Sequence, residues 1–175
     1  MTRELITNLP LFLAHSLELE QESAERLREF ADTMRHHQQG ELAALFDELA
    51  AFSDLHTQEI AAVCEGIDLP RLNPWEFVWP GTEAPETSGY ASLRYEMQPQ
   101  EALRLMAAQE GAAADFYADV AARSPDPEIV KHAAEFAREE REHEALLLER
   151  LATLQASATL AAQPAPDIDP PHQPE

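Results

Sequence analysis

Cysteine is almost absent from the 175 residues, since Cys64 is the single one. One cysteine excludes an intrachain disulfide framework, a CxxC redox pair and an all-cysteine zinc or iron–sulfur site, and it fits a reducing cytoplasm. Basic residues are also few: 12 Lys and Arg stand against 33 Asp and Glu, for a formal charge of −21. Such an acidic chain repels nucleic-acid phosphates and anionic lipid headgroups, so we expect neither a nucleic-acid nor a membrane partner. Cations are the expected small partners.

Long apolar runs are missing as well. The longest run near the N-terminus, Leu9 to Ala14, is far shorter than the roughly 18–20 residues that a membrane-spanning helix needs. A basic region followed by a small-residue cleavage site is also lacking. We therefore expect an unprocessed, soluble, cytoplasmic protein.

Most of the 13 prolines gather in two stretches, 70–99 and 164–174. Proline disrupts the interior of a helix but suits its first turn, so its distribution delimits helical segments. Between the prolines, the helix formers Ala, Leu, Glu, Gln and Arg are abundant, and the β-branched residues typical of strands are sparse. We predict four helices, at residues 9–37, 41–65, 99–123 and 127–158.

Short polar turns join these helices in pairs, which predicts two antiparallel hairpins. The connection between the hairpins, 67–98, is long and aromatic, as in the crossover of a ferritin-like four-helix bundle. We therefore expect an all-α, ferritin-like bundle over residues 1–160 and a Pro-rich, disordered tail at 161–175. The motif from Pro74 to Pro80 is expected to pack against the bundle, with a dimer contact or a lid as the alternative.

Each predicted helix carries polar residues inside its inward-facing apolar stripe, traced at spacings of three and four residues. These residues are Glu20, then Ser53 with His56, then Glu110, then Glu140 with His143. His15 lies off the stripe and is expected at the surface. A buried, unpaired carboxylate is costly, and the stripes contain no Lys or Arg. One or two divalent metal ions, bound by three carboxylates and two imidazoles, would remove that cost.

Glu140 and His143 are three residues apart on one helix, so both side chains can reach one metal ion. Two-metal sites in helix bundles take a Glu from each of two helices and a Glu-x-x-His pair from each of the other two. This chain has one complete pair, and Ser53 precedes His56 in place of the second Glu. The alternative for Glu140 and His143 is a solvated charged face.

The sequence resembles the rubrerythrin-like branch of the ferritin-like superfamily over residues 9–158. The resemblance is strongest in Phe136-Ala-Arg-Glu-Glu140-Arg-Glu-His143, followed by Glu110-Gly-Ala-Ala-Ala-Asp-Phe-Tyr117 and the segment from Glu20 to Leu27. It implies a non-haem di-iron oxidoreductase of oxidative stress that acts on hydrogen peroxide or dioxygen, with Mn or Zn as alternative metals. It also implies the metal ligands Glu20, His56, Glu110, Glu140 and His143, with Tyr117 hydrogen-bonding to them.

The chain departs from this family in two respects. Ser53 stands where the family has a carboxylate, so a single metal ion is an alternative. Glu59, one turn beyond His56, is a better substitute for the absent carboxylate than Asp54, and Ser53 itself is the other possible ligand. A four-cysteine rubredoxin-type module is lacking, so a separate protein would donate electrons. We also expect a homodimer. Two other functions remain open: ferritin-like oxidation or sequestration of ferrous iron, and a metal-free helical adaptor that has lost the site.

Overall fold

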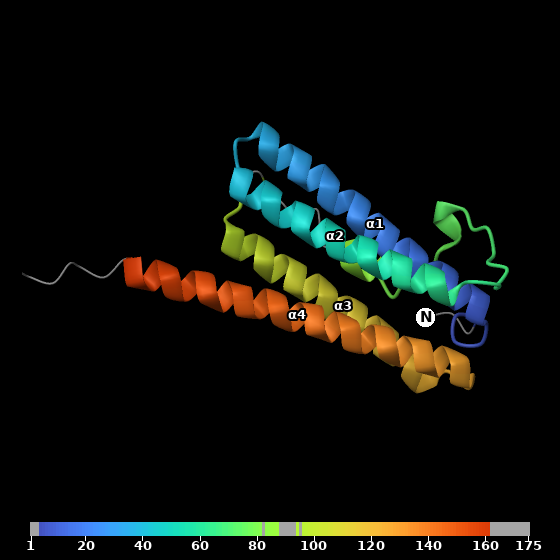
Figure 1. Cartoon of the computed structure of the whole chain (residues 1–175). Coiled ribbons are helices and arrows are strands. Elements are labelled where there is room, and N and C mark those ends of the chain that lie inside the picture. Colours follow the sequence, from blue (N-terminus) through green and yellow to red (C-terminus); the bar gives the residue numbers. More distant parts are fainter. Residues whose placement is uncertain (1–3, 82, 88–93, 95, 162–175) are drawn as a thin grey trace, which may run out of the picture.

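The computed structural model of the chain is built from four long helices (Figure 1). It describes residues 4–81, 83–87, 94 and 96–161. The helices are α1 (Leu9–His36), α2 (Gly40–Val63), α3 (Pro99–Arg123) and α4 (Pro127–Ala161). Two single-turn 3-10 helices, η1 (Pro74–Glu76) and η2 (Pro85–Thr87), lie between α2 and α3. No described residue belongs to a strand, so the predicted all-α class is confirmed.

Local hydrogen bonds fix where the helices begin. The side chain of Asn8 caps α1 by accepting a hydrogen bond from the backbone N–H of Leu11 at 3.1 Å. The Asp126 carboxylate accepts one from the N–H of Glu128 at 2.9 Å at the start of α4. The first residue of α3 is Pro99, whose fixed φ and missing N–H suit that position. Helix starts near the prolines are therefore as predicted.

The helices pack as two antiparallel hairpins, α1 with α2 and α3 with α4 (Figure 1). Large side chains separate the backbones of the two hairpins, whereas the short η2 packs closely against both α1 and α3. The crossover thus bridges the hairpins on the side of α1 and α3. This arrangement confirms the predicted bundle of two hairpins.

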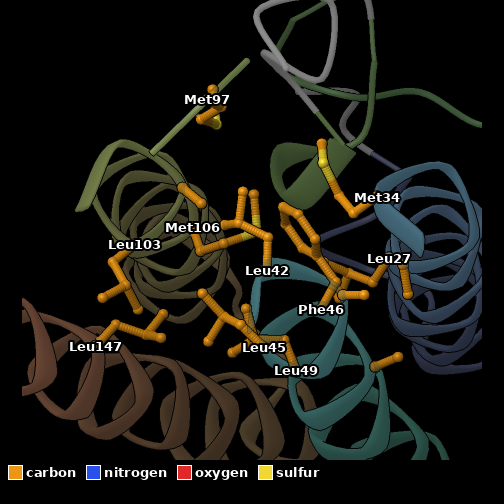
Figure 2. Packing of buried hydrophobic residues seen from close by; sticks show 14 of the residues in the cluster. Leu27, Met34, Leu42, Leu45, Phe46, Leu49, Met97, Leu103, Met106 and Leu147 are labelled. Carbon is orange, nitrogen blue, oxygen red and sulfur yellow. The ribbon is translucent and has the colours of Figure 1, made fainter. Parts of the chain in front are cut away.

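Two apolar clusters occupy the two ends of the bundle. The cluster near the α1–α2 turn includes Leu27, Phe46, Leu103 and Leu147 (Figure 2). The cluster near the α3–α4 turn includes Phe12, Leu19, Tyr117 and Phe136. Positions 20 on α1 and 140 on α4 fall between these clusters along their helices. Polar groups at the middle of the bundle therefore have apolar layers on both sides.

His15 is buried, with 1% of its surface exposed, so its expected surface position is wrong. Its Nδ1 donates to the carbonyl oxygen of Leu11 at 2.9 Å, and its Nε2 accepts a hydrogen bond from the N–H of Val78 at 3.1 Å. A helical stripe reveals only the face that packs on other helices, whereas here the crossover covers a second face of α1. Both ring nitrogens of His15 are hydrogen-bonded, and Nε2 holds the crossover.

The aromatic motif of the crossover packs against the bundle through two of its three large rings. Phe77 and Trp79 lie 5.0 and 5.2 Å from the ring of His15, measured between centroids. Trp79 also contacts Phe116 of α3 at 5.9 Å. Trp75, in contrast, is 78% exposed. The expected packing is confirmed for Phe77 and Trp79.

Within the described part of the chain, no helix has both the length and the apolar character needed to cross a membrane. Helix α4 extends to Ala161. The remainder of the predicted Pro-rich tail lies outside the described residues.

Candidate metal centre

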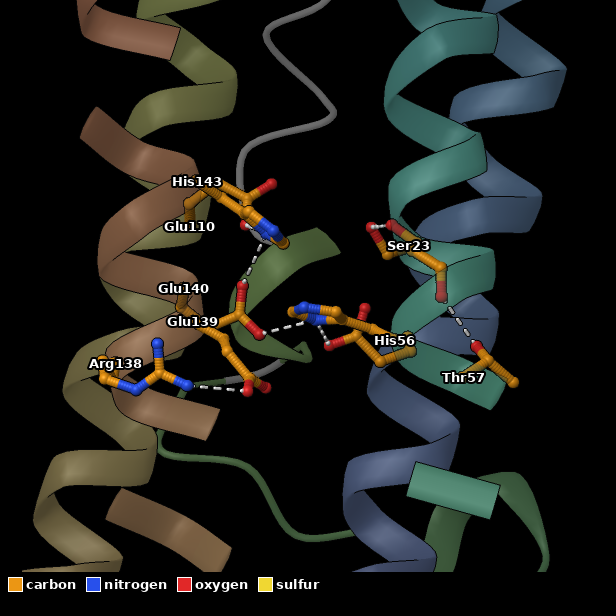
Figure 3. A network of polar contacts seen from close by, with 10 residues as sticks. Ser23, His56, Thr57, Glu110, Arg138, Glu139, Glu140 and His143 are labelled. Carbon is orange, nitrogen blue, oxygen red and sulfur yellow. Dashed lines mark hydrogen bonds and ion pairs between the residues drawn. The ribbon is translucent and has the colours of Figure 1, made fainter. Parts of the chain in front are cut away.

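Three of the predicted site residues meet between α2 and α4 (Figure 3). His56 of α2 places its Nδ1 3.2 Å from Oε1 of Glu140, and His143 places its Nδ1 3.6 Å from Oε2 of the same carboxylate. The two imidazole rings are 4.5 Å apart between centroids, at an interplanar angle of 32°. One ligand atom from each of these residues lies within 4.8 Å of the others, which is close enough for all three to bind one metal ion.

Glu20 of α1 and Glu110 of α3 complete the contribution of the four helices. Oε1 of Glu20 lies 3.5 Å from Nδ1 of His56, and Oε2 of Glu110 lies 3.7 Å from Nδ1 of His143. Glu20 and Glu140 are almost wholly buried, with 2% and 1% of their surfaces exposed. The structure thus brings together all five residues predicted as ligands from the helical stripes.

A sixth residue, Glu86 of η2, was not found from the sequence. It is 3% exposed, and its carboxylate lies with those of Glu20 and Glu140, one oxygen of each within 4.8 Å of the others. Glu86 belongs to an irregular segment, so no helical periodicity marks it. The small apolar residues Ala84 and Pro85 beside it, in an otherwise polar stretch, are the one local signal of burial.

The two alternative ligands of α2 do not join this central group. Ser53 is buried, and its hydroxyl donates a hydrogen bond to Oγ of Ser23 at 3.3 Å. Glu59 is exposed and gathers instead with His56 and Glu139 at the side of the centre. Glu59 can therefore contact cations in solvent, but it does not replace the carboxylate that is absent at position 53.

The ion pairs of Glu140 dominate the electrostatics of the centre. Burial alone would raise the pKa of this carboxyl, but the close ion-pair contacts with His143 and His56 outweigh burial and lower the pKa to about 2. Burial likewise opposes protonation of the two imidazoles. Glu140 nevertheless raises the pKa of His56 to about 9. Glu110 and Glu140 together raise the pKa of His143 to about 9. In the metal-free chain, Glu140 is thus an anion between two cations.

The remaining carboxyls have raised pKa values. Burial is the main cause that raises the pKa of Glu20 well above its ordinary value, and the negative charge of Glu140 adds to it. Burial also raises the pKa of Glu86 well above its ordinary value, and here the negative charge of Glu20 adds to it. Burial raises the pKa of Glu110 to about 7, although a hydrogen bond with His143 opposes it. In the described residues, no ion pair joins any of these carboxylates to Lys or Arg.

Unsatisfied acceptors show that the centre fits metal ions. Oε1 of Glu20, of Glu86 and of Glu140 is buried without a hydrogen bond, although the first and last lie at ion-pair distance from His56. Buried polar atoms normally have partners, and each exception needs an explanation. Carboxylate oxygens and imidazole nitrogens are ligands of Fe, Mn and Zn, so a cation bound here would supply the missing partner.

Tyr117 lies beside the centre within the apolar cluster near the α3–α4 turn. It is fully buried, with Phe12 at 6.2 Å and Phe136 at 5.4 Å between ring centroids. Burial first, and then the negative charges of Glu20 and Glu140, raise the pKa of its hydroxyl well above its ordinary value. The Tyr117 hydroxyl is buried without a hydrogen-bond partner in this structure, so the hydrogen bond to the ligands that the resemblance implies stays a prediction.

A cavity of about 200 Å³ between α2 and α4 reaches the centre from the protein surface. Glu110 and His143 lie in its wall, and most of the rest is apolar, including Leu49, Phe52 and Leu146. Phe52 and Leu146 are themselves exposed at its mouth. The cavity therefore offers small uncharged molecules a path to the two ligands that are least buried.

Comparison with known proteins agrees with this geometry. The model of the rubrerythrin family matches residues 12–151, a range that contains all six residues of the centre. Among solved structures, the chain is similar to an uncharacterized conserved protein from Magnetospirillum magnetotacticum MS-1, with 34% sequence identity and a TM-score of 0.64. That similarity covers 93% of this chain and 99% of the other. The comparison with curated proteins gave no match.

Proposed function

This chain belongs to the rubrerythrin family, and we propose that it is an oxidoreductase that reduces hydrogen peroxide or dioxygen at a pair of bound iron ions. The observation that carries the proposal is the buried centre itself. Four carboxylates and two imidazoles converge from four helices and the crossover, and three buried oxygens among them lack hydrogen bonds. Burial of these carboxylates would cost free energy in a bundle that binds no metal ion, whereas bound metal ions would offset that cost.

The donor set is centred on Glu140. His56 lies against Oε1 of this carboxylate and His143 against Oε2, with Glu110 in contact with His143. Glu20 approaches from α1, where it contacts His56 and lies near Glu140. Bound iron would supply the electrons that reduce the oxidant. The protein's part is to hold these ligands in a dry interior and to leave one approach open.

The cavity between α2 and α4 provides that approach. Its apolar wall favours a neutral molecule such as peroxide or dioxygen over an anion, which the acidic surface also repels. Glu110 borders both the cavity and His143.

Reduction of one peroxide to two waters needs two electrons and two protons. We assign the proton supply to solvent, which reaches the centre through the cavity lined by Glu110 and His143. We propose that a separate protein donates the electrons, because the 175 residues hold a single cysteine. The donor would re-reduce the metal pair after each turnover.

The experiment that tests this function combines metal loading with oxidation kinetics. The chain is loaded with Fe²⁺ without oxygen, freed of loose ions, analysed for iron and then mixed with peroxide or dioxygen. We expect about two irons per chain and rapid oxidation by peroxide. The variant Glu140→Ala should lose both properties, whereas Glu142→Ala, which removes an exposed carboxylate paired with Arg138, should keep both. Absence of bound iron in the unmodified chain would refute the proposal.

A second function, oxidation and sequestration of ferrous iron, is favoured by a separate observation. The exposed Glu59 and the partly exposed Glu139 gather with His56 at the edge of the centre. Such a group, on a chain of charge −21, can attract Fe²⁺ from solvent and pass it inward. Iron accumulating far beyond two ions per chain would favour this function over peroxide reduction.

A further inference from the structure

The position three residues before His56 holds no carboxylate, and the structure shows what takes its place. The buried Ser53 hydroxyl donates to Oγ of Ser23, and Ser23 lies close enough to Glu86 to lower the pKa of its carboxyl. Two small side chains on α1 and α2 thus stand where a long one would project.

Glu86 is held firmly in that position by its neighbours. It lies in η2, which packs against both α1 and α3, and the adjacent Ala84 is 1% exposed within an apolar cluster. Oε1 of Glu86 is buried without a hydrogen bond, in the same group as the unsatisfied Oε1 of Glu20. A carboxylate that is 3% exposed, lies near two others and has an oxygen without a hydrogen bond is suited to bind a cation.

We propose that Glu86 is a metal ligand that the crossover supplies in place of the carboxylate that α2 lacks at Ser53. This inference rests on the proposed function. With Glu86 included, the buried donors form two groups of three that share Glu140: His56 with His143, and Glu20 with Glu86. Each group has enough donors for one ion. Without Glu86, the second group is reduced to Glu20 and the shared carboxylate.

With Glu86 as a ligand, a metal ion would also stabilise the position of the crossover. The ion would connect η2 to α1 and α4, in addition to the apolar packing of η2. Loss of the second ion should therefore loosen the crossover but leave the helical hairpins intact. A carboxylate placed on α2 by substitution at Ser53 should make Glu86 dispensable, because either residue then completes the second group.

Calorimetric titration with Fe²⁺ in the absence of oxygen tests these statements on four full-length chains. The unmodified chain should bind two ions. Glu86→Gln, which keeps the size and removes the charge, should bind one ion and weaken the second step at least tenfold. The control Glu83→Gln changes an exposed carboxylate of the same segment and should bind two. The double variant Ser53→Glu with Glu86→Gln should recover the second ion.

The outcomes separate this inference from the proposed function. Two ions bound with unchanged affinity by Glu86→Gln would overturn the role of Glu86 and leave the function standing. No ion bound by the unmodified chain would overturn both. Helical content measured by circular dichroism shows whether each variant folds, and recovery in the double variant supports the proposal even where Glu86→Gln alone folds poorly.

Discussion

The stability of the metal-free chain should fall as the pH rises from about 6.5 to about 9. The folded state raises the pKa of His56 from 6.5 to about 9 through Glu140, although burial opposes the change. In that pH range, the folded chain holds a proton that the unfolded chain releases. The stabilisation by the ion pair is therefore complete below pH 6.5 and is lost as the pH passes about 9. Glu110, with its pKa raised to about 7, changes stability in the same direction.

The size of the effect follows from His56, which is 8% exposed and so little screened by water. A rise from 6.5 to about 9 corresponds to about 3 kcal/mol of stability. The lowered pKa of Glu140 describes the same interaction from its other partner and adds nothing further. His143 adds less, because 22% of its side chain is exposed. For a chain of this size, about 3 kcal/mol is a decrease in Tm of about 6–12 °C.

Thermal unfolding of the metal-free chain, followed by circular dichroism at intervals between pH 6 and 9.5, measures this decrease. In Glu140→Gln, the slope with pH should flatten, because His56 loses the charge that holds its proton. In the metal-loaded chain, the slope should be weaker or reversed, since bound imidazoles are already deprotonated. A Tm of the metal-free chain that stays constant or increases over this range would refute the reasoning.

Three further substitutions test the packing of the bundle by equilibrium unfolding. Phe12→Ala should lower the free energy of unfolding by about 3–5 kcal/mol, because Phe12 is fully buried and its ring centroid lies 6.1 Å from that of Phe136. Trp75→Ala removes a side chain that is 78% exposed, so it should change the free energy of unfolding by less than about 0.5 kcal/mol. Gly111→Ala should stabilise by up to about 1 kcal/mol through helix propensity, because the new Cβ would meet only the movable carboxylate of Glu144, whose Oε1 lies 2.9 Å away. A loss of more than about 1 kcal/mol in Gly111→Ala would show that Glu144 cannot move.

The sequence predicted the helices and the helical part of the centre because both depend on periodic patterns. Prolines and polar turns delimit the helices, and a carboxylate within an apolar stripe is visible wherever the spacing of three and four residues holds. Glu20 and Glu140 stand on such stripes, and the structure buries both in the middle of the bundle. Helix geometry alone brings Glu140 and His143 to one side.

The buried residues of the crossover could not be predicted from sequence patterns, because tertiary contacts alone determine which of them are buried. Glu86 is as deeply enclosed as Glu20, yet η2 is one turn long and has no face whose pattern can be traced. The same segment explains why His15 is buried although a surface position was predicted. Val78 and the rings of Phe77 and Trp79 cover the face of α1 on which His15 lies. Both differences have one origin, namely a loop that packs as part of the core.

Charge balance in the centre links stability to function. In the metal-free chain, Glu140 is neutralised by protonated His56 and His143, while the raised pKa values of Glu20 and Glu86 favour their neutral forms. Each metal ion that enters replaces such protons at groups that are already in position. Metal affinity should therefore rise with pH over the range in which the metal-free chain loses stability. Proton release on loading, measured in weakly buffered solution, should accordingly be largest near neutral pH and decline as the pH approaches 9.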